Sequence, residues 1–388
     1  MLKKLEELFD ELFSARQSIP AGMVQYQAPA DSDLPYKLHL RVEEDGSGIL
    51  IINASTVLHL NQTAAELAYY LIQGKTDEKI IALISERYDV DAGQASDDLA
   101  DFTGRIDSLL QMEDLDPVTY LNMDRVSPYS QKLSAPYRMD CALTYQVRET
   151  VDAGVAPVER VSRELSTEEW EQILENIHNA SIPQVVFTGG EPTLRDDLPE
   201  LIAKAEELGI VCGLLTDGLS LTTKKAVDAV LNKGLDHIML LTDAHNKKFW
   251  SAVNRLVPED IAVTVHFTLT AENAGSFKKT LDKLSKAGVT HLSLSTNDEN
   301  LADALEDANQ HAVDLGMALV WDLPVPYSGS NPVAFELGKN KHAHPDGAGK
   351  AWMYVEPDGD VLPAQGINKV LGNILKDPWK KIWKKRGA

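Results

Sequence analysis

Between residues 139 and 322 the hydrophobic pattern of the chain switches repeatedly between two periods. Short apolar runs, typical of buried β-strands, alternate with segments in which apolar side chains recur every three or four residues, as in amphipathic helices. The strand-like runs are "MDCALTY", "QVVFT", "IVCGLLT", "HIMLLT", "IAVTVHFTLT", "HLSLS" and "MALVWD". Strands that alternate with helices in this way lie parallel in one sheet. The pattern therefore predicts an α/β fold, a partial (β/α)6-type TIM-like barrel rather than a flat sheet.

Two of the intervening helices carry clear sequence signals. The segment "STEEWEQILENIHNA" opens with a capping box, Ser166 with Glu169. The segment "DDLPELIAKAEELG" ends at Gly209, a typical helix stop. The predicted buried stripes are Trp170, Ile173, Leu174 and Ile177 in the first helix, and Leu198, Leu201, Ile202 and Ala205 in the second. In barrels of this kind the chemistry lies at the C-terminal ends of the strands.

With the remaining sequence, the chain is expected to have five parts, one of which is this barrel. The expected parts are an N-terminal amphipathic helix and linker (1–37), a small sheet followed by three helices in winged-helix order (38–112), a proline-containing linker (113–135), the barrel (136–322), and a small irregular extension with a hairpin at Asp358-Gly359 (323–388).

Composition excludes several classes of function. The formal net charge of −22 opposes binding to nucleic acid, since a polyanion would be repelled over most of the surface. No apolar run is long enough to span a membrane. The only cysteines are Cys141 and Cys212, which excludes a disulfide framework and fits a reducing, cytoplasmic location. Both fall inside strand-like runs, so we expect core thiols.

Polar residues follow three consecutive strand-like runs. After "QVVFT" comes Gly189-Gly190-Glu191-Pro192, after "IVCGLLT" come Asp217 and Gly218, and after "HIMLLT" comes Asp243. Glycines let a backbone approach a ligand closely, and a carboxylate can bind an ammonium group. All of these residues are also common in turns, so the residues alone leave an unliganded turn as the alternative.

Together these segments resemble the radical S-adenosylmethionine (SAM) enzymes. The resemblance rests on "FTGGEPTLRDDLPELI" followed by "GLLTDG" and covers residues 136–322. It implies that the amino group of the SAM methionine binds at Gly189, Gly190, Glu191 and Pro192. It also implies that Thr216, Asp217 and Gly218 match a "TNG" strand end, and that Leu241, Thr242 and Asp243 match an "SLD" motif whose serine is absent here.

The flanking parts resemble two modules that accompany this family. Residues 38–112 are similar to the peptide-binding chaperone of pyrroloquinoline quinone biosynthesis, PqqD. That similarity implies recognition of the leader segment of a ribosomal precursor peptide, which adds as a strand to a sheet edge. Residues 323–388 resemble a SPASM-type extension, which normally carries auxiliary iron–sulfur clusters.

The chain departs from the family where iron should be bound. The resemblance places the three thiolates of the CxxxCxxC motif, which hold a [4Fe–4S] cluster, at Val147, Val151 and Gly154. The resemblance places auxiliary ligands at Ala364, at Ser328 and near Ala343. None of these side chains replaces a soft, anionic thiolate. Whether the cysteines were lost naturally or by substitution stays open.

Three interpretations follow from the sequence. The first is a cluster-less peptide-maturation protein that binds leader peptide, and SAM weakly, without radical chemistry. The second is an active radical SAM enzyme whose cluster ligands lie elsewhere. The third is a metal-independent barrel enzyme that uses Asp243, Glu191 or His245. The residues "HAHPD", with His342, His344 and Asp346, are a weak candidate for a metal site.

Overall fold

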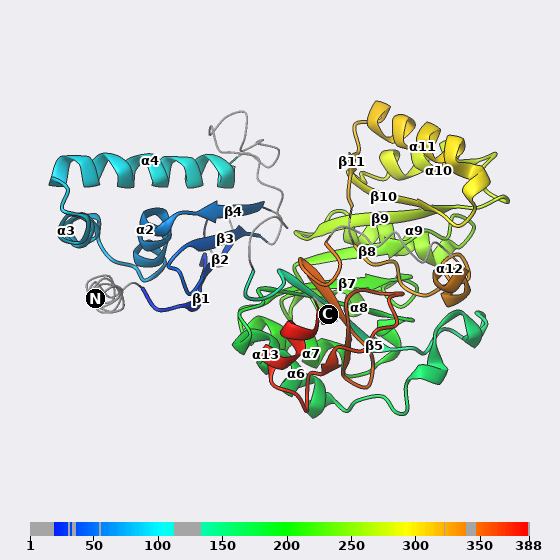
Figure 1. Cartoon of the computed structure of the whole chain (residues 1–388). Helices are drawn as coiled ribbons and strands as arrows, with labels where there is room; N and C mark the ends of the chain where they lie inside the picture. The colour runs from blue at the N-terminus through cyan, green and yellow to red at the C-terminus, as the bar shows by residue number, and fades with distance from the viewer. Residues whose placement is uncertain are drawn as a thin grey trace. The chain divides into compact units, whose positions relative to one another are not determined.

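The computed structural model describes residues 19–29, 32, 36–53, 56–111, 133–321, 323–338 and 347–386. They belong to two compact units, Met1–Ser134 and Ala135–Ala388, called here the N-terminal unit and the barrel unit (Figure 1). Residues 1–18, where the N-terminal amphipathic helix is expected, lie outside the described residues, as do most of the expected 113–135 linker and the "HAHPD" segment. Within the described part of the chain, no helix is both long and apolar enough to cross a bilayer.

The N-terminal unit is an antiparallel sheet followed by three helices, the order that the sequence predicts. The strands, in spatial order, are β1 (Gly22–Gln27), β2 (Lys37–Val42), β3 (Gly48–Ile52) and β4 (Thr56–Leu60). The helices are α2 (Gln62–Ile72), α3 (Asp77–Tyr88) and α4 (Ala92–Gln111). Leu40, Leu50, Leu58, Ile80 and Leu99 lie in one buried core, which joins the sheet to the helices. Strand β1 was not predicted, and it pairs along β2.

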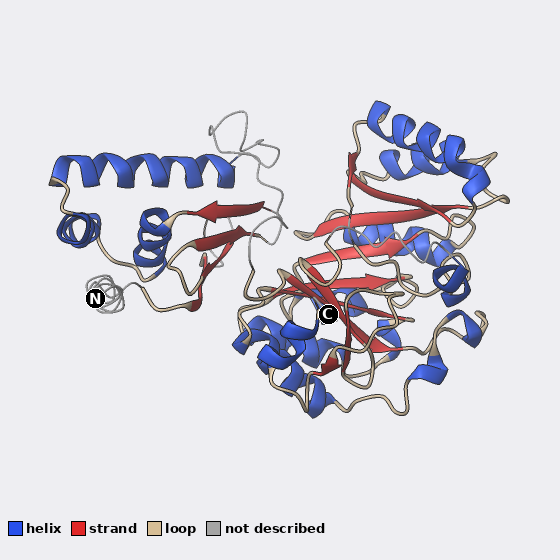
Figure 2. Ribbon diagram, in the orientation of Figure 1, coloured by secondary structure: helices blue, strands red, loops and turns tan. Residues whose placement is uncertain are grey.

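The barrel unit contains every strand that the alternating pattern predicts. In chain order these are β5 (Arg138–Thr144), β6 (Gln184–Gly189), β7 (Val211–Thr216), β8 (His237–Leu241), β9 (Ala262–Leu269), β10 (His291–Thr296) and β11 (Ala318–Leu319). Each pairs in parallel with the next. Among the described residues the sheet has two open edges, β11 and the C-terminal strand β14 (Gly372–Asn373), so the barrel is partial, as expected (Figure 2).

The connecting helices also follow the sequence signals. They are α6 (Thr167–Asn179), α7 (Leu198–Glu207), α8 (Lys224–Leu231), α9 (Lys247–Leu256), α10 (Phe277–Lys286) and α11 (Ala302–Asp314). The capping box of Ser166 and Glu169 is present, and both predicted stripes are buried. Gly209 follows α7 with a φ of +67°, which a side chain would strain.

The two faces of the parallel sheet have different neighbours. Because the strands follow one another in chain order and crossovers are right-handed, all connecting helices lie on one face. The opposite face, called here the inner face, carries Ala142, Val186, Leu215 and Met239, which pack against residues from the C-terminal extension. Strand alternation places Cys141 on the helix-covered face.

The C-terminal extension continues the same sheet. Strand β12 (Trp352–Val355) pairs in parallel with β5, and β13 (Asp360–Leu362) and β14 (Gly372–Asn373) follow antiparallel. The hairpin predicted at Asp358-Gly359 joins β12 to β13. Two short helices, α12 (Val333–Gly338) and α13 (Trp379–Lys385), complete the unit.

Candidate functional site

The two glycines after β6 contact their own chain. The N–H of Gly190 donates to the carbonyl of Thr144 at 2.9 Å, and the carbonyl of Gly189 accepts from the N–H of Tyr327 at 2.9 Å. A Cβ atom on Gly190 would lie 2.2 Å from the carbonyl oxygen of Gln146. Glycine is therefore required here by the close approach of the segment that follows β5, whether or not a ligand binds.

Glu191 is the centre of a buried hydrogen-bond network. Its side chain accepts from the N–H of Thr193 (3.0 Å) and from the hydroxyl groups of Thr193 (2.5 Å) and Thr216 (2.6 Å). The second carboxylate oxygen accepts from the N–H of Asp217 at 2.8 Å. Glu191 is only 4% exposed. Burial raises the pKa of this carboxyl, and the neighbouring Asp217 charge raises it further, whereas the hydrogen bonds from the Thr193 and Thr216 hydroxyl groups and the Asp217 N–H act in the opposite direction. The network joins the ends of β6 and β7.

Asp217 forms a two-point ion pair with Arg148. The Arg148 Nε and Nη2 atoms lie 2.5 and 2.8 Å from the two oxygens of Asp217. The same Nη2 donates to the hydroxyl groups of Ser220 (2.9 Å) and Thr193 (3.2 Å). Arg148 lies in the loop after β5, so the ion pair connects this loop to the Glu191 network. Arg148 could not be predicted from the sequence, because nothing in a single loop arginine signals a partner sixty-nine positions away.

Asp243 does not join this network. It is exposed, and its backbone carbonyl accepts from the N–H of Asn246 at the start of α9. His245 is exposed as well. The structure thus brings together Glu191, Thr216 and Asp217 of the predicted residues, with Pro192 buried beside them, while Asp243 lies apart.

A buried histidine lies farther along the inner face. His266 is hydrogen-bonded to the hydroxyl groups of Ser293 (3.0 Å), Ser295 (3.0 Å) and Thr268 (3.1 Å). Burial lowers the pKa of His266 to about 4, so the ring is neutral near pH 7. The three hydroxyl groups hold the ring in place, so His266 has a packing role. With this lowered pKa it is also a weak base.

The positions that match the cluster ligands hold no atom that binds iron. Val147 packs among Ala142, Tyr145, Tyr327 and other buried residues. Val151 is half-buried, and Gly154 is exposed with its N–H donating to the Asp152 carboxylate at 2.8 Å. These residues do not fit a thiolate-ligated cluster.

The two cysteines do not supply those ligands either. Cys141 in β5 and Cys212 in β7 are both fully buried, as expected for core thiols. Burial raises the pKa of the Cys141 thiol well above its usual value, which disfavours the thiolate. In the described part of the chain, no group of three His, Cys, Asp or Glu residues is arranged to hold a metal ion.

The extension is held by aromatic and carboxylate side chains instead. The Tyr145 hydroxyl donates to Glu356 at 2.8 Å, and Arg160 Nε lies 3.0 Å from the same oxygen. The Tyr327 hydroxyl donates to Glu336 at 2.9 Å. Ala364, which matches an auxiliary ligand, is buried. Ser328 forms a small bridge with Asn331, and Ala343 lies outside the described residues.

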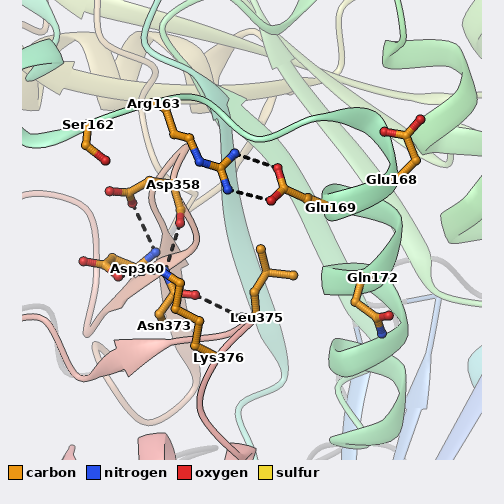
Figure 3. Close-up of a pocket in the computed structure, with 10 residues that line it drawn as sticks. All are labelled: Ser162, Arg163, Glu168, Glu169, Gln172, Asp358, Asp360, Asn373, Leu375 and Lys376. Atoms are coloured by element: carbon orange, nitrogen blue, oxygen red, sulfur yellow. Dashed lines mark hydrogen bonds and ion pairs between the residues drawn. The ribbon is translucent and has the colours of Figure 1, made fainter.

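A separate cavity of about 620 Å³ lies between the start of α6 and the β12–β13 hairpin (Figure 3). Arg163 crosses it to reach Glu169, with contacts of 2.6 and 2.7 Å. The lining residues are Ser162, Arg163, Glu168, Glu169, Gln172, Asp358, Asp360, Asn373, Leu375 and Lys376. None of them belongs to the Glu191 network, and their mixed charges select no single ligand class.

Comparisons with known families agree with the resemblances seen in the sequence. Residues 141–266 match the Radical SAM superfamily, and residues 48–108 match Coenzyme PQQ synthesis protein D (PqqD). Both expected relationships are thereby confirmed for these segments. The resemblance of residues 323–388 to a SPASM-type extension stays a prediction.

Curated relatives include peptide cyclases. A PqqA peptide cyclase from Streptomyces rochei is 28% identical over 257 residues, which cover 58% of this chain and 70% of that protein. A PqqA peptide cyclase from Granulibacter bethesdensis is 30% identical over 154 residues, which cover 36% of this chain and 40% of that protein.

Solved structures share the fold. Streptococcus suis SuiB, solved with its precursor peptide SuiA, superposes with a TM-score of 0.56 at 15% identity and covers 89% of this chain and 86% of that chain. SuiB bound to SAM gives a TM-score of 0.55 at 15% identity, over 93% and 88% of the two chains. At this identity the likeness shows a common fold.

We expect Gly190→Ala to lower the free energy of unfolding by about 1–3 kcal/mol, because the new methyl group would displace the Gln146 carbonyl. Urea unfolding followed by tryptophan fluorescence measures the effect. Gly154→Ala is the matched control. Gly154 is exposed and its nearest neighbour would lie 3.3 Å away, so this change should stay within about 0.5 kcal/mol. Equal stability of the two variants would contradict the packing role of Gly190.

We expect Glu336 to make stability depend on pH. Burial raises its pKa from 4.5 to about 7, against the opposing effects of the Tyr327 hydrogen bond and Arg160, and the Glu356 charge raises it further. Because the folded pKa is the higher one, the stabilisation is fully present below pH 4.5 and is lost as pH rises through 7.

The variant Glu336→Gln isolates this effect, since glutamine keeps an acceptor for Tyr327 and does not ionise. In urea unfolding at a series of pH values, the variant should gain stability relative to the unmodified protein as pH rises from 4.5 to above 7. Parallel pH profiles of the two proteins would show that Glu336 does not titrate in this range.

Proposed function

We propose that this chain is a ribosomal-peptide maturation protein of the radical SAM type, in a form without its iron–sulfur clusters. One observation carries the proposal: a PqqD-like segment precedes a radical SAM segment in the same chain. The relatives named as PqqA peptide cyclases support the choice of a peptide as the partner. The fold shared with SuiB, which was solved with a precursor peptide, is consistent with it.

The N-terminal unit supplies the binding surface for the peptide. An extended peptide binds most simply by adding a strand to an open sheet edge, where backbone groups provide affinity. Strand β4 forms one edge of the described sheet, whereas β1 of the same chain covers the outer side of β2. Strand β4 also lies inside the PqqD-like segment, and β1 precedes it. We therefore assign the leader peptide to the β4 edge.

The barrel unit is not expected to perform radical chemistry in this form. In the family, a bound cluster and SAM together supply the radical that abstracts hydrogen from a peptide. Here the matching positions are Val147, Val151 and Gly154, whose side chains offer no thiolate. We propose, on the strength of the resemblance, that Gly189, Gly190, Glu191, Pro192, Thr216, Asp217 and Asp243 occupy the positions that bind SAM in cluster-bearing members of the family. We place the protein in the cytoplasm because a radical SAM ancestor and two reduced thiols fit a reducing compartment.

The two alternatives have less support. An active radical enzyme would need other cluster ligands, and both cysteines are buried in strands. A metal-independent enzyme would use Asp243, Glu191 or His245. The Glu191 carboxylate is engaged by four donors, and the other two residues are exposed.

Peptide binding can be tested on the full chain with a random peptide library. A selected peptide, labelled with a fluorophore, should bind saturably in anisotropy titrations. Binding should weaken when alternate residues of the peptide are N-methylated, because every second N–H of an added strand faces its neighbour. A scrambled peptide is the control.

Hydrogen exchange then locates the peptide. Backbone amides of Thr56–Leu60 in β4 should become more protected when the peptide is present. Protection confined to the barrel unit, or insensitivity to N-methylation, would show that strand addition at β4 is wrong.

Cluster loss can be tested by anaerobic reconstitution with iron and sulfide. The unmodified protein should bind no [4Fe–4S] cluster, judged by visible absorbance and iron content. The triple variant Val147→Cys, Val151→Cys, Gly154→Cys should gain one, since three thiolates then match the family motif. A triple variant with cysteine at the exposed positions Val158, Val313 and Val370 controls for adventitious iron. A cluster that forms on the unmodified protein and cleaves SAM would contradict the proposal.

A further inference from the structure

The carboxylates of Glu191 and Asp217 are already hydrogen-bonded by the protein. SAM carries two positive groups, an ammonium and a sulfonium, and one carboxylate, so a site for its methionine portion must offer acceptors to the ammonium. Both oxygens of Glu191 accept hydrogen bonds from the chain, four in all. Both oxygens of Asp217 accept from Arg148. Neither carboxylate has an oxygen left without a donor.

Arg148 also places a permanent positive charge at this point. A guanidinium does not lose its proton in proteins, so the charge stays at every physiological pH. The ion pair of Arg148 with Asp217 is short and bidentate, which is the strongest geometry for an arginine–carboxylate pair. The side chains of Arg148 and Asp217 are 21% and 26% exposed, so the pair is shielded from water over most of its surface. The positive charge of Arg148 therefore lies within hydrogen-bonding distance of the Asp217 carboxylate, to which the cation of a ligand would have to bind.

The place of Arg148 in the chain explains why it can reach this point. It follows Val147, which is fixed in a buried cluster, and its carbonyl accepts from the N–H of Val151 at 2.8 Å. The loop that holds the three family ligand positions therefore presents the arginine. Contacts with Thr193 and Ser220 hold the guanidinium between the segments after β6 and β7.

We propose that Arg148 is an internal cation that takes the place of a ligand's ammonium group and excludes SAM from the strand-end site. The residues present thus do not fit the cofactor that the family resemblance implies. This inference rests on the proposed relationship of the barrel unit to SAM-binding proteins, but it is independent of peptide binding by the N-terminal unit.

Calorimetric titration with SAM tests the proposal on the full chain. The unmodified protein should show no saturable binding at millimolar SAM. Arg148→Gln removes the charge while keeping hydrogen-bond donors for Thr193 and Ser220, and it should bind SAM at least roughly tenfold more tightly. Arg148→Lys keeps the charge and should remain without binding. S-adenosylhomocysteine lacks the sulfonium charge. The Arg148→Gln substitution should therefore increase the affinity for S-adenosylhomocysteine less than it increases the affinity for SAM.

Arg163→Gln is the matched control. Arg163 forms a similar two-point pair with Glu169 but lines the separate cavity, so its loss should leave SAM binding unchanged. Thermal melting confirms that each variant is folded. Saturable micromolar binding to the unmodified protein would overturn the proposal whatever the variants do, and so would a folded Arg148→Gln that binds no SAM.

These outcomes are distinct from those that test the proposed function. If the Arg148→Gln variant does not bind SAM, only the proposed role of Arg148 is contradicted. Loss of the proposed function requires that no peptide binds, or that a cluster forms on the unmodified protein.

Discussion

The buried carboxylate of Glu191 is the interaction on which the strand ends depend. It accepts hydrogen bonds from two backbone N–H groups and two hydroxyl groups. Each unsatisfied buried donor costs about 1–3 kcal/mol, so the network fixes the positions of the segments after β6 and β7 together. The Arg148–Asp217 pair then attaches the loop after β5 to the same point. The loops after β5, β6 and β7 are thus held together by one hydrogen-bond network, although they are far apart in sequence.

Local sequence signals account for most of the barrel unit. Strand runs, the Ser166 capping box and the buried stripe around Trp170 are set by residues close in sequence, and the structure has all of them. The burial of Cys141 and Cys212 follows from their place inside apolar runs. What could not be predicted depends on distant partners. The pairing of β12 with β5, the added strand β1 and the reach of Arg148 to Asp217 are contacts that no local pattern encodes.

For the candidate site too, the sequence predicts which residues lie at the strand ends but not their contacts with distant parts of the chain. Sequence motifs correctly brought Glu191, Thr216 and Asp217 to adjoining strand ends. The motif did not show that the glycines are packed against Thr144 and Gln146. Where a metal cluster would brace the loop and the extension, this chain has Val147 in an apolar cluster and Glu356 between Tyr145 and Arg160. Packing and hydrogen bonds thus join the loop after β5 to the C-terminal extension.

The parallel pairing of β12 with β5 has a consequence for how the protein is made. More than 200 residues separate the paired strands, so one side of β5 stays uncovered until β12 has left the ribosome. At about 5–20 residues per second, that interval is on the order of 10–40 s. An open strand edge invites pairing with other chains during this time. Nascent chains of this protein should thus rely on chaperones or on dilution until the last strands arrive, and truncation near the C-terminus should yield aggregates instead of a shorter folded barrel.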